Sequence, residues 1–556
     1  MAKQNDLKFK LEIDTSLNKL LTNCTLFLNK YDSIPDKEYL NQLIYSHPIH
    51  KNKGKIEKIL NIINESGTFM QEKVLEIKDN AIMKQKRKEE LDQLTNFLNT
   101  DFKNILTNEP VNNKNILPLD EETKEKRTKT NDGFLIEDTT EDNKSLIGKK
   151  RKNSKNAFKF NCYICKKKLL PEDIHKFYGN LCNKCGDHNY SFRTLHLDLS
   201  GRIAIVTGGR VKIGYYIATK LLSYGCKVIT TSRFPKDTLF KYKSDPDYEK
   251  WKDNLIIYPI DFRFFESTIK FINYIKDNFT HIDILINNAA QTIRRTSSYY
   301  KYLLPIETKE LNEEEESKII KNDYINLQNR LSQDKSKDEN KNDLISLTDK
   351  EYKEMLPLSV IASQIKIMEE KDQPDINLIG NDGQAYDFSF GKNSWNLEFD
   401  EIPFQEFIEV QIINAWTPYY LCAKLKPLML KSPCLDKYIV NVTAVEGIFN
   451  HFKRTTHVHT NMAKAGLNMF TRTCGKYLKN QNIYMTCVDT GWVSPMNELH
   501  NLLDKDKKED YEDEFTSVPL DELDGAMRVL HPIIEGIKNK NYLYGILLKD
   551  YAKSDW

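Results

Sequence analysis

Residues 202–214 read RIAIVTGGRVKIG and are the clearest indication of the fold of this chain. The apolar run from Arg202 to Val206 predicts a short strand, and the glycines that follow it predict a tight turn. A strand, a glycine turn and a helix start form an element whose backbone amides and positive helix end receive a pyrophosphate. The helix is indicated by apolar residues at helical spacing: Ile217, Ala218, Leu221 and Leu222.

From about residue 200 onward, short apolar runs alternate with helical patterns. Further strands are predicted at Lys227 to Thr231, Leu255 to Tyr258, Ile284 to Ile286 and Tyr438 to Val442. Strands that alternate with helices form a parallel sheet covered on both faces. The sequence therefore predicts an α/β fold, a doubly wound parallel sheet of the Rossmann type, over residues 196–556.

A stretch of weak periodicity near residues 306–354 interrupts this pattern, and we interpret it as part of an insertion over about 301–395. The insertion leaves the sheet at the carboxyl edge, where ligands bind in such folds. Tyr299, Tyr300 and Asn393 to Trp395, near its two ends, favour a lid or interaction arm over the site. A solvated decoration is the alternative.

Two cysteine pairs lie upstream of the α/β domain. Cys162 and Cys165 form one C-x-x-C pair, and Cys182 and Cys185 form another after sixteen residues. Such spacing places four thiolates around one metal and favours Zn²⁺, with no ligand position left open for water. A structural zinc ribbon is therefore predicted over residues 158–195, four free core cysteines being the alternative. The remaining six cysteines are scattered, unlike a disulfide framework.

The first 157 residues carry weaker patterns. Apolar residues at helical spacing predict a helical region over 1–100, whereas 101–157 are polar and aperiodic, as in a disordered linker. The linker ends in KKRK at 149–152, typical of a nuclear import signal or of a solvated charge run. The helical region and the ribbon are the predicted docking elements for a protein partner.

Composition excludes several classes of protein. The 556 residues include 82 Lys and Arg against 80 Asp and Glu, so a nucleic-acid partner is not expected. No apolar run approaches the roughly 18 residues that span a bilayer, and the first residues lack the apolar core of a secretory signal. An intracellular, cytoplasmic protein without a membrane partner is predicted, or a nuclear one if the basic run is an import signal.

The order of motifs in the α/β domain resembles the short-chain dehydrogenase/reductase family. The loop at 207–214 is similar to its T-G-x-x-x-G-x-G motif, and Asn287 to Ala290 to its N-N-A-G motif. Asn414, Lys464 and the turn from Asp489 to Val493 match further motifs in the family's order. The resemblance covers roughly 198–300 and 396–550, and implies a nicotinamide cofactor, a small-molecule substrate and the homo-oligomers common in the family.

The end of the second strand indicates which nicotinamide cofactor is bound. NAD enzymes usually place an acid there, whereas this chain has Ser232 and Arg233, which suit a 2′-phosphate. NADP(H) is therefore predicted, with NAD(H) as the alternative. The residues that the resemblance places on the cofactor are Thr207, Gly208, Gly209, Arg210, Lys212, Ile213, Gly214, Ser232, Arg233, Asp261, Asn288, Ala289, Lys464, Gly491 and Val493.

The catalytic positions depart from the family pattern. Thr460 stands where the family has its proton-donating Tyr, and Ala444, next to Thr443, where it has its Ser. Threonine lacks the acidity of a phenol, so His457, His459 and Glu446 are alternative proton carriers. Lys212 replaces the middle glycine of the loop. The predicted catalytic residues are Asn414, Thr443, His459, Thr460 and Lys464.

Two functions follow from these observations. The first is an NADP(H)-dependent oxidoreductase that transfers hydride to or from a carbonyl or alcohol, and the retained Asn414 and Lys464 favour it. The second is a catalytically impaired nucleotide-binding scaffold or redox sensor with a zinc-ribbon interaction module, favoured by the missing Tyr and Ser.

Overall fold

The computed structural model describes residues 72–97, 160–321, 357–363, 379–380, 383–387, 393–495 and 508–556. The predicted linker at 101–157 lies outside the described residues, as do its basic run and most of the predicted helical region at 1–100. The same holds for the centre of the predicted insertion.

The domain is built on one eight-stranded sheet with the strand order β3-β2-β1-β4-β5-β6-β7-β8. All neighbouring strands pair in parallel except β7 and β8, which are antiparallel. The strands are β1 (Ile203–Val206), β2 (Lys227–Ser232), β3 (Leu255–Pro259), β4 (Ile284–Asn287), β5 (Lys437–Thr443), β6 (Ile483–Asp489), β7 (Leu547–Lys549) and β8 (Ala552–Ser554). This arrangement confirms the predicted doubly wound α/β fold.

The strand register sorts the apolar side chains onto two faces of the sheet. Ile205 lies level with Ile229 on β2 and with Leu285 on β4, and all three belong to one buried cluster. Their sequence neighbours, among them Ala204 and Ile284, point the other way and belong to a second cluster. Because successive residues of a strand face opposite sides, the nearly continuous apolar runs of the sequence require cover on both faces.

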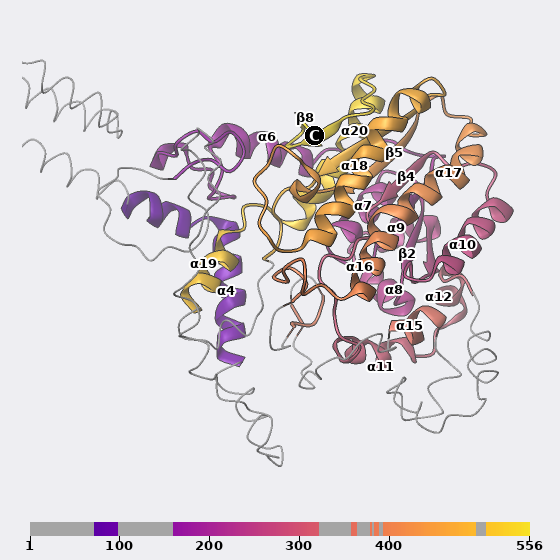
Figure 1. Cartoon of the computed structure of the whole chain (residues 1–556), viewed down its shortest axis with the longest axis horizontal. Coiled ribbons are helices and arrows are strands. Elements are labelled where there is room, and N and C mark those ends of the chain that lie inside the picture. The colour runs from indigo at the N-terminus through magenta and orange to yellow at the C-terminus, as the bar shows by residue number, and fades with distance from the viewer. Residues whose placement is uncertain are drawn as a thin grey trace, which may run out of the picture.

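Helices supply that cover on each side (Figure 1). The face with Ala204 is covered by α7 (Lys212–Ser223), α8 (Pro235–Lys243), α9 (Tyr248–Trp251) and α20 (Glu522–Asn539). The face with Ile205 is covered by α10 (Phe265–Asn278), α17 (Thr417–Leu430) and α18 (Val458–Lys479). The helix α16 (Phe404–Gln411) packs on α18 and continues into α17 through a π-helical turn, Ile412–Trp416.

Part of the predicted insertion packs beside the carboxyl ends of β2 and β3. It contains a 3₁₀ segment (Ser298–Leu303), α11 (Leu304–Glu307), α12 (Glu313–Lys318) and α15 (Leu358–Ser363). The Glu307 carboxylate accepts hydrogen bonds from the backbone amides of Lys236 and Asp237 in the first turn of α8. Ile320 donates its amide to the Ile257 carbonyl at the edge of β3. The insertion is thus anchored to the sheet rather than detached from it.

The region of the four cysteines, residues 160–195, forms a small unit that we call the cysteine module. It ends in α6 (Asn183–Arg193), packs against α4 (Ile82–Phe97), and shares a buried apolar cluster with the α/β domain through Val493 and Leu520. The helix α19 (Lys508–Ser517) lies beside α4 (Figure 1). The module is therefore attached to the segment that leads from β6 to α20.

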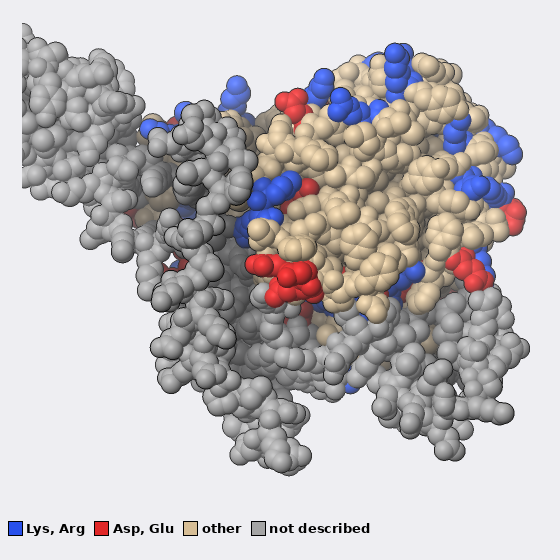
Figure 2. Space-filling view, in the orientation of Figure 1, with Lys and Arg blue, Asp and Glu red and all other residues tan. Residues whose placement is uncertain are grey.

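A broad uncharged face lies over α16, α17 and α18 (Figure 2). Its exposed apolar side chains include Trp416, Tyr419, Met462 and Met469. The homo-oligomer stays a prediction, and this is the face on which we would expect a second copy to bind. Within the described ranges, no helix is both long and apolar enough to span a bilayer.

Candidate functional site

The glycine loop between β1 and α7 is closely packed at each of its glycines. Gly208 has a φ of +71°, in the left-handed region that favours glycine. A Cβ on Gly209 would lie 1.9 Å from Thr230 Oγ1, and a Cβ on Gly214 would lie 2.1 Å from the Gly208 carbonyl oxygen. The loop can therefore bring backbone amides close to a bound anion at the start of α7, as a pyrophosphate requires.

Lys212, which begins α7, has a left-handed backbone conformation of the kind that favours glycine. Its φ is +53°, a left-handed value that costs a non-glycine residue roughly 1–2 kcal/mol. Burial raises the pKa of Glu522 at the start of α20, and the charge of Lys212 opposes this shift without reversing it. The loop thus keeps the shape that the family motif predicts.

Residues after β4 hold the glycine loop in place. The Asn288 side-chain amide donates to the carbonyls of Thr207 and Gly208 at 3.0 and 3.1 Å. Thr207 Oγ1 accepts from the backbone amides of Asn288 and Ala289, both at 3.0 Å. Asn288, which the resemblance placed on the cofactor, thus binds the loop that would carry it.

The end of β2 places Arg233 between two aromatic rings. Its guanidinium lies 4.6 Å from the Tyr300 ring centroid and 5.6 Å from that of Phe234, and it donates to the Tyr300 hydroxyl at 2.7 Å. Burial would raise the pKa of Tyr300, but the charge and hydrogen bond of Arg233, together with the charges of Arg263 and Arg295, outweigh burial and lower that pKa. The predicted lid residue Tyr300 therefore meets Arg233. Its neighbour Tyr299 donates to the Ala385 carbonyl.

The other predicted polar residues near β2 and β3 have protein partners. Ser232 Oγ accepts from the Phe234 amide and the Thr238 hydroxyl. Arg210 is buried and donates to Asp237 at 2.8 Å, which balances its charge. Asp261 accepts from the Arg263 guanidinium through both carboxylate oxygens. Arg233, at the end of β2, is half-buried.

The catalytic half of the site gathers where β5 ends and α18 begins. Lys464 is buried, and its Nζ donates to the Val442 carbonyl at 2.9 Å. Burial lowers the pKa of Lys464 to about 8, against the opposing charge of Glu446. The hydroxyls of Thr443 and Thr460 are buried and have no hydrogen-bond partner among the described residues. Burial also raises the pKa of Glu446, and Asp489 adds to the shift.

The two histidines lie beside other protein side chains. His457 stacks on Trp395 with ring centroids 3.9 Å apart, and its Nδ1 lies 2.9 Å from the Trp395 carbonyl. His459 is fully buried, with Nε2 3.5 Å from a carboxylate oxygen of Glu406 on α16. Both ring nitrogens of His459, like the hydroxyls of Thr443 and Thr460, are buried and have no hydrogen-bond partner among the described residues, so all three stay candidates beside Lys464.

Asn414 sits in the π-helical turn between α16 and α17. Its side-chain carbonyl accepts from the Gln291 amide at 2.8 Å, and its Nδ2 donates to the Gln291 carbonyl at 2.9 Å. π-Turns inside helices are frequent at functional sites. Asn414 thereby holds the chain that follows β4.

The turn after β6 contacts the cysteine module. Gly491 has a φ of +78°, and the Trp492 amide donates to the Tyr163 hydroxyl at 3.0 Å. Asp489 accepts from the Gly491 amide at 2.9 Å and pairs with Lys549 at 2.8 Å. Tyr163 was missed as a neighbour of the site, and Tyr300 was predicted over the site but not as the partner of Arg233, because no local pattern encodes a contact between distant segments.

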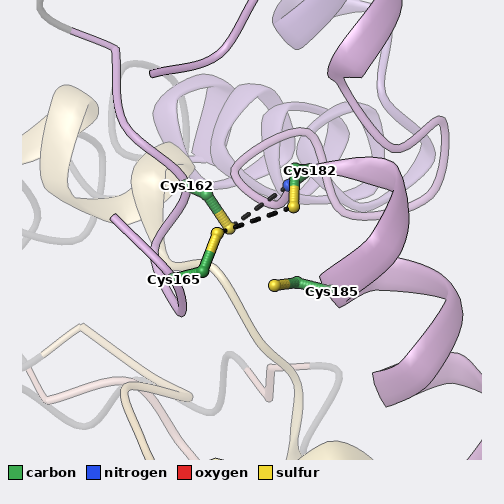
Figure 3. Close-up of side chains that lie close together, drawn as sticks. All are labelled: Cys162, Cys165, Cys182 and Cys185. Atoms are coloured by element: carbon green, nitrogen blue, oxygen red, sulfur yellow. Dashed lines mark hydrogen bonds between the residues drawn. The ribbon is translucent and has the colours of Figure 1, made fainter. Parts of the chain in front are cut away.

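The four cysteine thiols converge on one point (Figure 3). Their sulfur atoms all lie within 4.8 Å of one another, and those of Cys165 and Cys182 are 3.7 Å apart. A tetrahedral Zn²⁺ with bonds of about 2.3 Å holds its sulfurs roughly 3.8 Å apart. The Cys182 amide donates to Cys162 Sγ at 3.3 Å. The donor set and its spacing fit one thiolate-bound metal.

The site fits a dinucleotide on two independent observations. The glycine loop leaves no room for a Cβ at Gly209 or Gly214. At the other end of the site, the buried hydroxyls of Thr443 and Thr460 have no hydrogen-bond partner among the described residues. The glycine loop, the Arg233 guanidinium and Lys464 all lie at the carboxyl edge of the sheet, where such folds bind ligands.

Comparisons with known proteins agree with this architecture. Residues 202–304 match the short chain dehydrogenase family. Uncharacterized protein R665 of Acanthamoeba polyphaga mimivirus is 30% identical over 403 residues, which are 70% of this chain and 74% of that protein. A (+)-neomenthol dehydrogenase of Capsicum annuum is 34% identical over 93 residues, 16% of this chain and 29% of the enzyme.

The match to the dehydrogenases is therefore partial: the chain spans between 29% and 38% of the length of the neomenthol dehydrogenase and of the short chain dehydrogenase pgmD of Aspergillus terreus. Among solved structures, the RhlG/NADP complex of Pseudomonas aeruginosa is 14% identical with a TM-score of 0.35. That comparison covers 63% of this chain and 95% of RhlG.

Proposed function

Because the chain belongs to the short-chain dehydrogenase/reductase family, we propose that it is an oxidoreductase that moves hydride between NADP(H) and a carbonyl or alcohol substrate. The observation that carries the proposal is the meeting of the glycine loop, Arg233 and Lys464 at one edge of the sheet. The test is oxidation of NADPH by the full chain with a panel of aldehydes and ketones. We expect a substrate-dependent rate with at least one of them.

In this proposal different residues bind different parts of NADP(H). The amides of the glycine loop and the start of α7 hold the pyrophosphate, and Arg233 holds the 2′-phosphate. Lys464 binds the hydroxyls of the nicotinamide ribose, next to the Val442 carbonyl that it already contacts. NADP(H), when bound, supplies or accepts the hydride.

The proton reaches the substrate oxygen from Lys464. Its pKa of about 8 lies near neutrality, as a general acid requires. Thr460 precedes Lys464 by one helical turn, and its unpartnered hydroxyl is suited to relay the proton and to bind the substrate oxygen together with Thr443. Reduction of a carbonyl then consumes one hydride and one proton and yields the alcohol.

The pH profile tests this assignment of the proton. Below pH 8 Lys464 carries its proton, so the reduction rate should be constant there. Above pH 8 the proton is lost and the rate should fall about tenfold for each pH unit. The Lys464→Arg variant, whose guanidinium stays charged, should lack this fall even if it is slower. A wild-type rate that is level from pH 7 to 10 would contradict the assignment.

Cofactor preference is proposed to depend on Arg233. The Arg233→Ala variant should bind NADPH about 10- to 30-fold more weakly, because a charge-assisted bond to phosphate is lost. Its affinity for NADH, which lacks that phosphate, should change less than twofold. Titration of both variants with both nucleotides measures this. Equal losses for NADPH and NADH would show that Arg233 supports the fold and does not read the phosphate.

We also propose that the cysteine module binds one structural Zn²⁺, which the convergence of the four thiols supports. Metal analysis of the purified full chain should give one zinc per chain. The Cys165→Ser variant, which removes the exposed ligand, should lose most of it.

The alternative function is a nucleotide-binding scaffold without chemistry. The replacement of the family Tyr by Thr460 is the observation that favours it. A scaffold would bind NADPH as tightly as the enzyme but would show no turnover with any substrate. The pH profile and the turnover screen therefore separate the two functions, whereas binding alone does not.

A further inference from the structure

The cysteine module contacts the turn that follows β6 at the carboxyl edge of the sheet, where the proposed cofactor site lies. Tyr163, which lies between the first two cysteines, accepts a hydrogen bond from the Trp492 amide at 3.0 Å. Its hydroxyl would be 3.3 Å from a Cβ placed on Gly491. The turn from Asp489 to Val493 follows β6 directly, and Asp489 ends that strand at the carboxyl edge. The loop that carries Cys162 and Cys165 is thus hydrogen-bonded directly to the turn after β6.

The same module also fixes the start of α20. Asp524, which is fully buried, accepts from the Tyr178 hydroxyl at 2.9 Å and from the Asn189 side chain at 2.8 Å. Arg193 at the end of α6 pairs with Asp524 at 2.8 Å and with Asp521 at 2.7 Å. Asp521 caps α20, so both ends of the stretch between β6 and α20 are held by the module.

Apolar contacts extend this attachment to the glycine loop. Val493 and Leu520 are buried in one cluster with Cys162 and Cys182, and Ile213 of the glycine loop packs against that cluster. A Cβ on Gly525 would be 3.0 Å from Ile213 and 3.4 Å from Val493. The α4 helix adds a bond from Arg87 to the Leu520 carbonyl at 2.8 Å. The cluster that contains Cys162 and Cys182 is therefore in packing contact with the glycine loop and with the turn after β6.

We infer that the cysteine module is a positioning element of the cofactor site, in which Tyr163 holds the turn from Asp489 to Val493 and the bound metal holds Tyr163. The inference rests on the proposed function for its effect on cofactor affinity. It goes beyond that function because it makes the affinity depend on a metal that does not touch cofactor or substrate. A structural zinc that merely stabilised its own fold would not affect the turn.

The first experiment replaces Tyr163 with phenylalanine in the full chain. This variant keeps the ring and the four cysteines and removes the acceptor for the Trp492 amide. We expect unchanged zinc content, a changed Trp492 emission, and NADPH binding about 3- to 10-fold weaker, as for loss of one hydrogen bond. Subtracting the spectrum of a Trp492→Phe variant isolates the Trp492 signal from those of the other tryptophans.

The matched control is Tyr190→Phe, because Tyr190 lies on α6 of the same module and is exposed. It should change neither the Trp492 emission nor NADPH affinity. If Tyr163→Phe also left both at wild-type values, the positioning role would be wrong.

The second experiment removes the metal from the wild-type full chain with a chelator and restores it with Zn²⁺ alone. We expect the Trp492 emission and the NADPH affinity to change on removal and to return on restoration. Loss of zinc with no change in Trp492 emission would overturn the inference. The emission is read without nucleotide, so a zinc-loaded protein that never binds NADPH would refute the proposed function and still leave the positioning role measurable.

Discussion

The Lys464→Ala variant is expected to lose at least about 100-fold in NADPH turnover, the lower end of what a general acid contributes. The loss has two physical causes. The ammonium that gives its proton is removed, and the ribose loses the group that orients it. Lys464 is buried and donates to the Val442 carbonyl at the end of β5, whereas the nearby Lys453 donates to the Val445 carbonyl. Initial rates over a range of NADPH concentrations measure the loss.

Two further variants give this result its meaning. Lys476→Ala lies on the same helix, is exposed, and should keep the wild-type rate. Lys464→Arg should retain NADPH affinity better than Lys464→Ala, because it keeps a positive charge. Equal turnover by wild type and Lys464→Ala would remove Lys464 from the mechanism and would favour the scaffold.

The Gly214→Ala variant is expected to weaken NADPH binding by about 100-fold. A Cβ at this position would lie 2.1 Å from the Gly208 carbonyl and 2.5 Å from the Asn288 side-chain nitrogen. Neither the backbone nor the Asn288 amide that holds the loop can move without opening the pyrophosphate site, and such overpacking costs roughly 1–3 kcal/mol. Fluorescence titration with NADPH measures the change.

The control for this variant is Gly466→Ala. Gly466 lies within α18 and has no atom within 4 Å of the position that a Cβ would take. Alanine is the better helix former there, so thermal stability should stay level or rise, with unchanged NADPH affinity. Wild-type NADPH affinity in Gly214→Ala would mean that the nucleotide does not bind at this loop.

Much of the sheet could be predicted from sequence because its strands are buried on both faces. The predicted strand from Lys227 to Thr231 differs from β2 by one residue, and that from Tyr438 to Val442 lies within β5. The strands β6, β7 and β8 were not predicted; β7 and β8 have three residues each, which carry too little periodicity. The left-handed backbone at Lys212 could be expected only from the glycine that the family has there.

The candidate site was harder to predict because its decisive contacts join distant segments. Nothing near Arg233 in the sequence indicates that it meets Tyr300, 67 residues later. The bond between Tyr163 and Trp492 spans 329 residues. His459 was chosen for the titration range of imidazole, but its burial against Glu406 depends on how α16 packs on α18. Tertiary packing decides which distant residues come into contact, and no local sequence pattern encodes that packing.

The most direct test of the central claim is a fluorescence titration of the full chain with NADPH and, separately, with NADH. Trp492 lies in the turn after β6 and is expected to report binding. We predict saturable NADPH binding at least about tenfold tighter than NADH binding, because only NADPH carries the 2′-phosphate that Arg233 is proposed to bind. Failure of both nucleotides to bind would contradict the proposed cofactor site and, with it, the oxidoreductase.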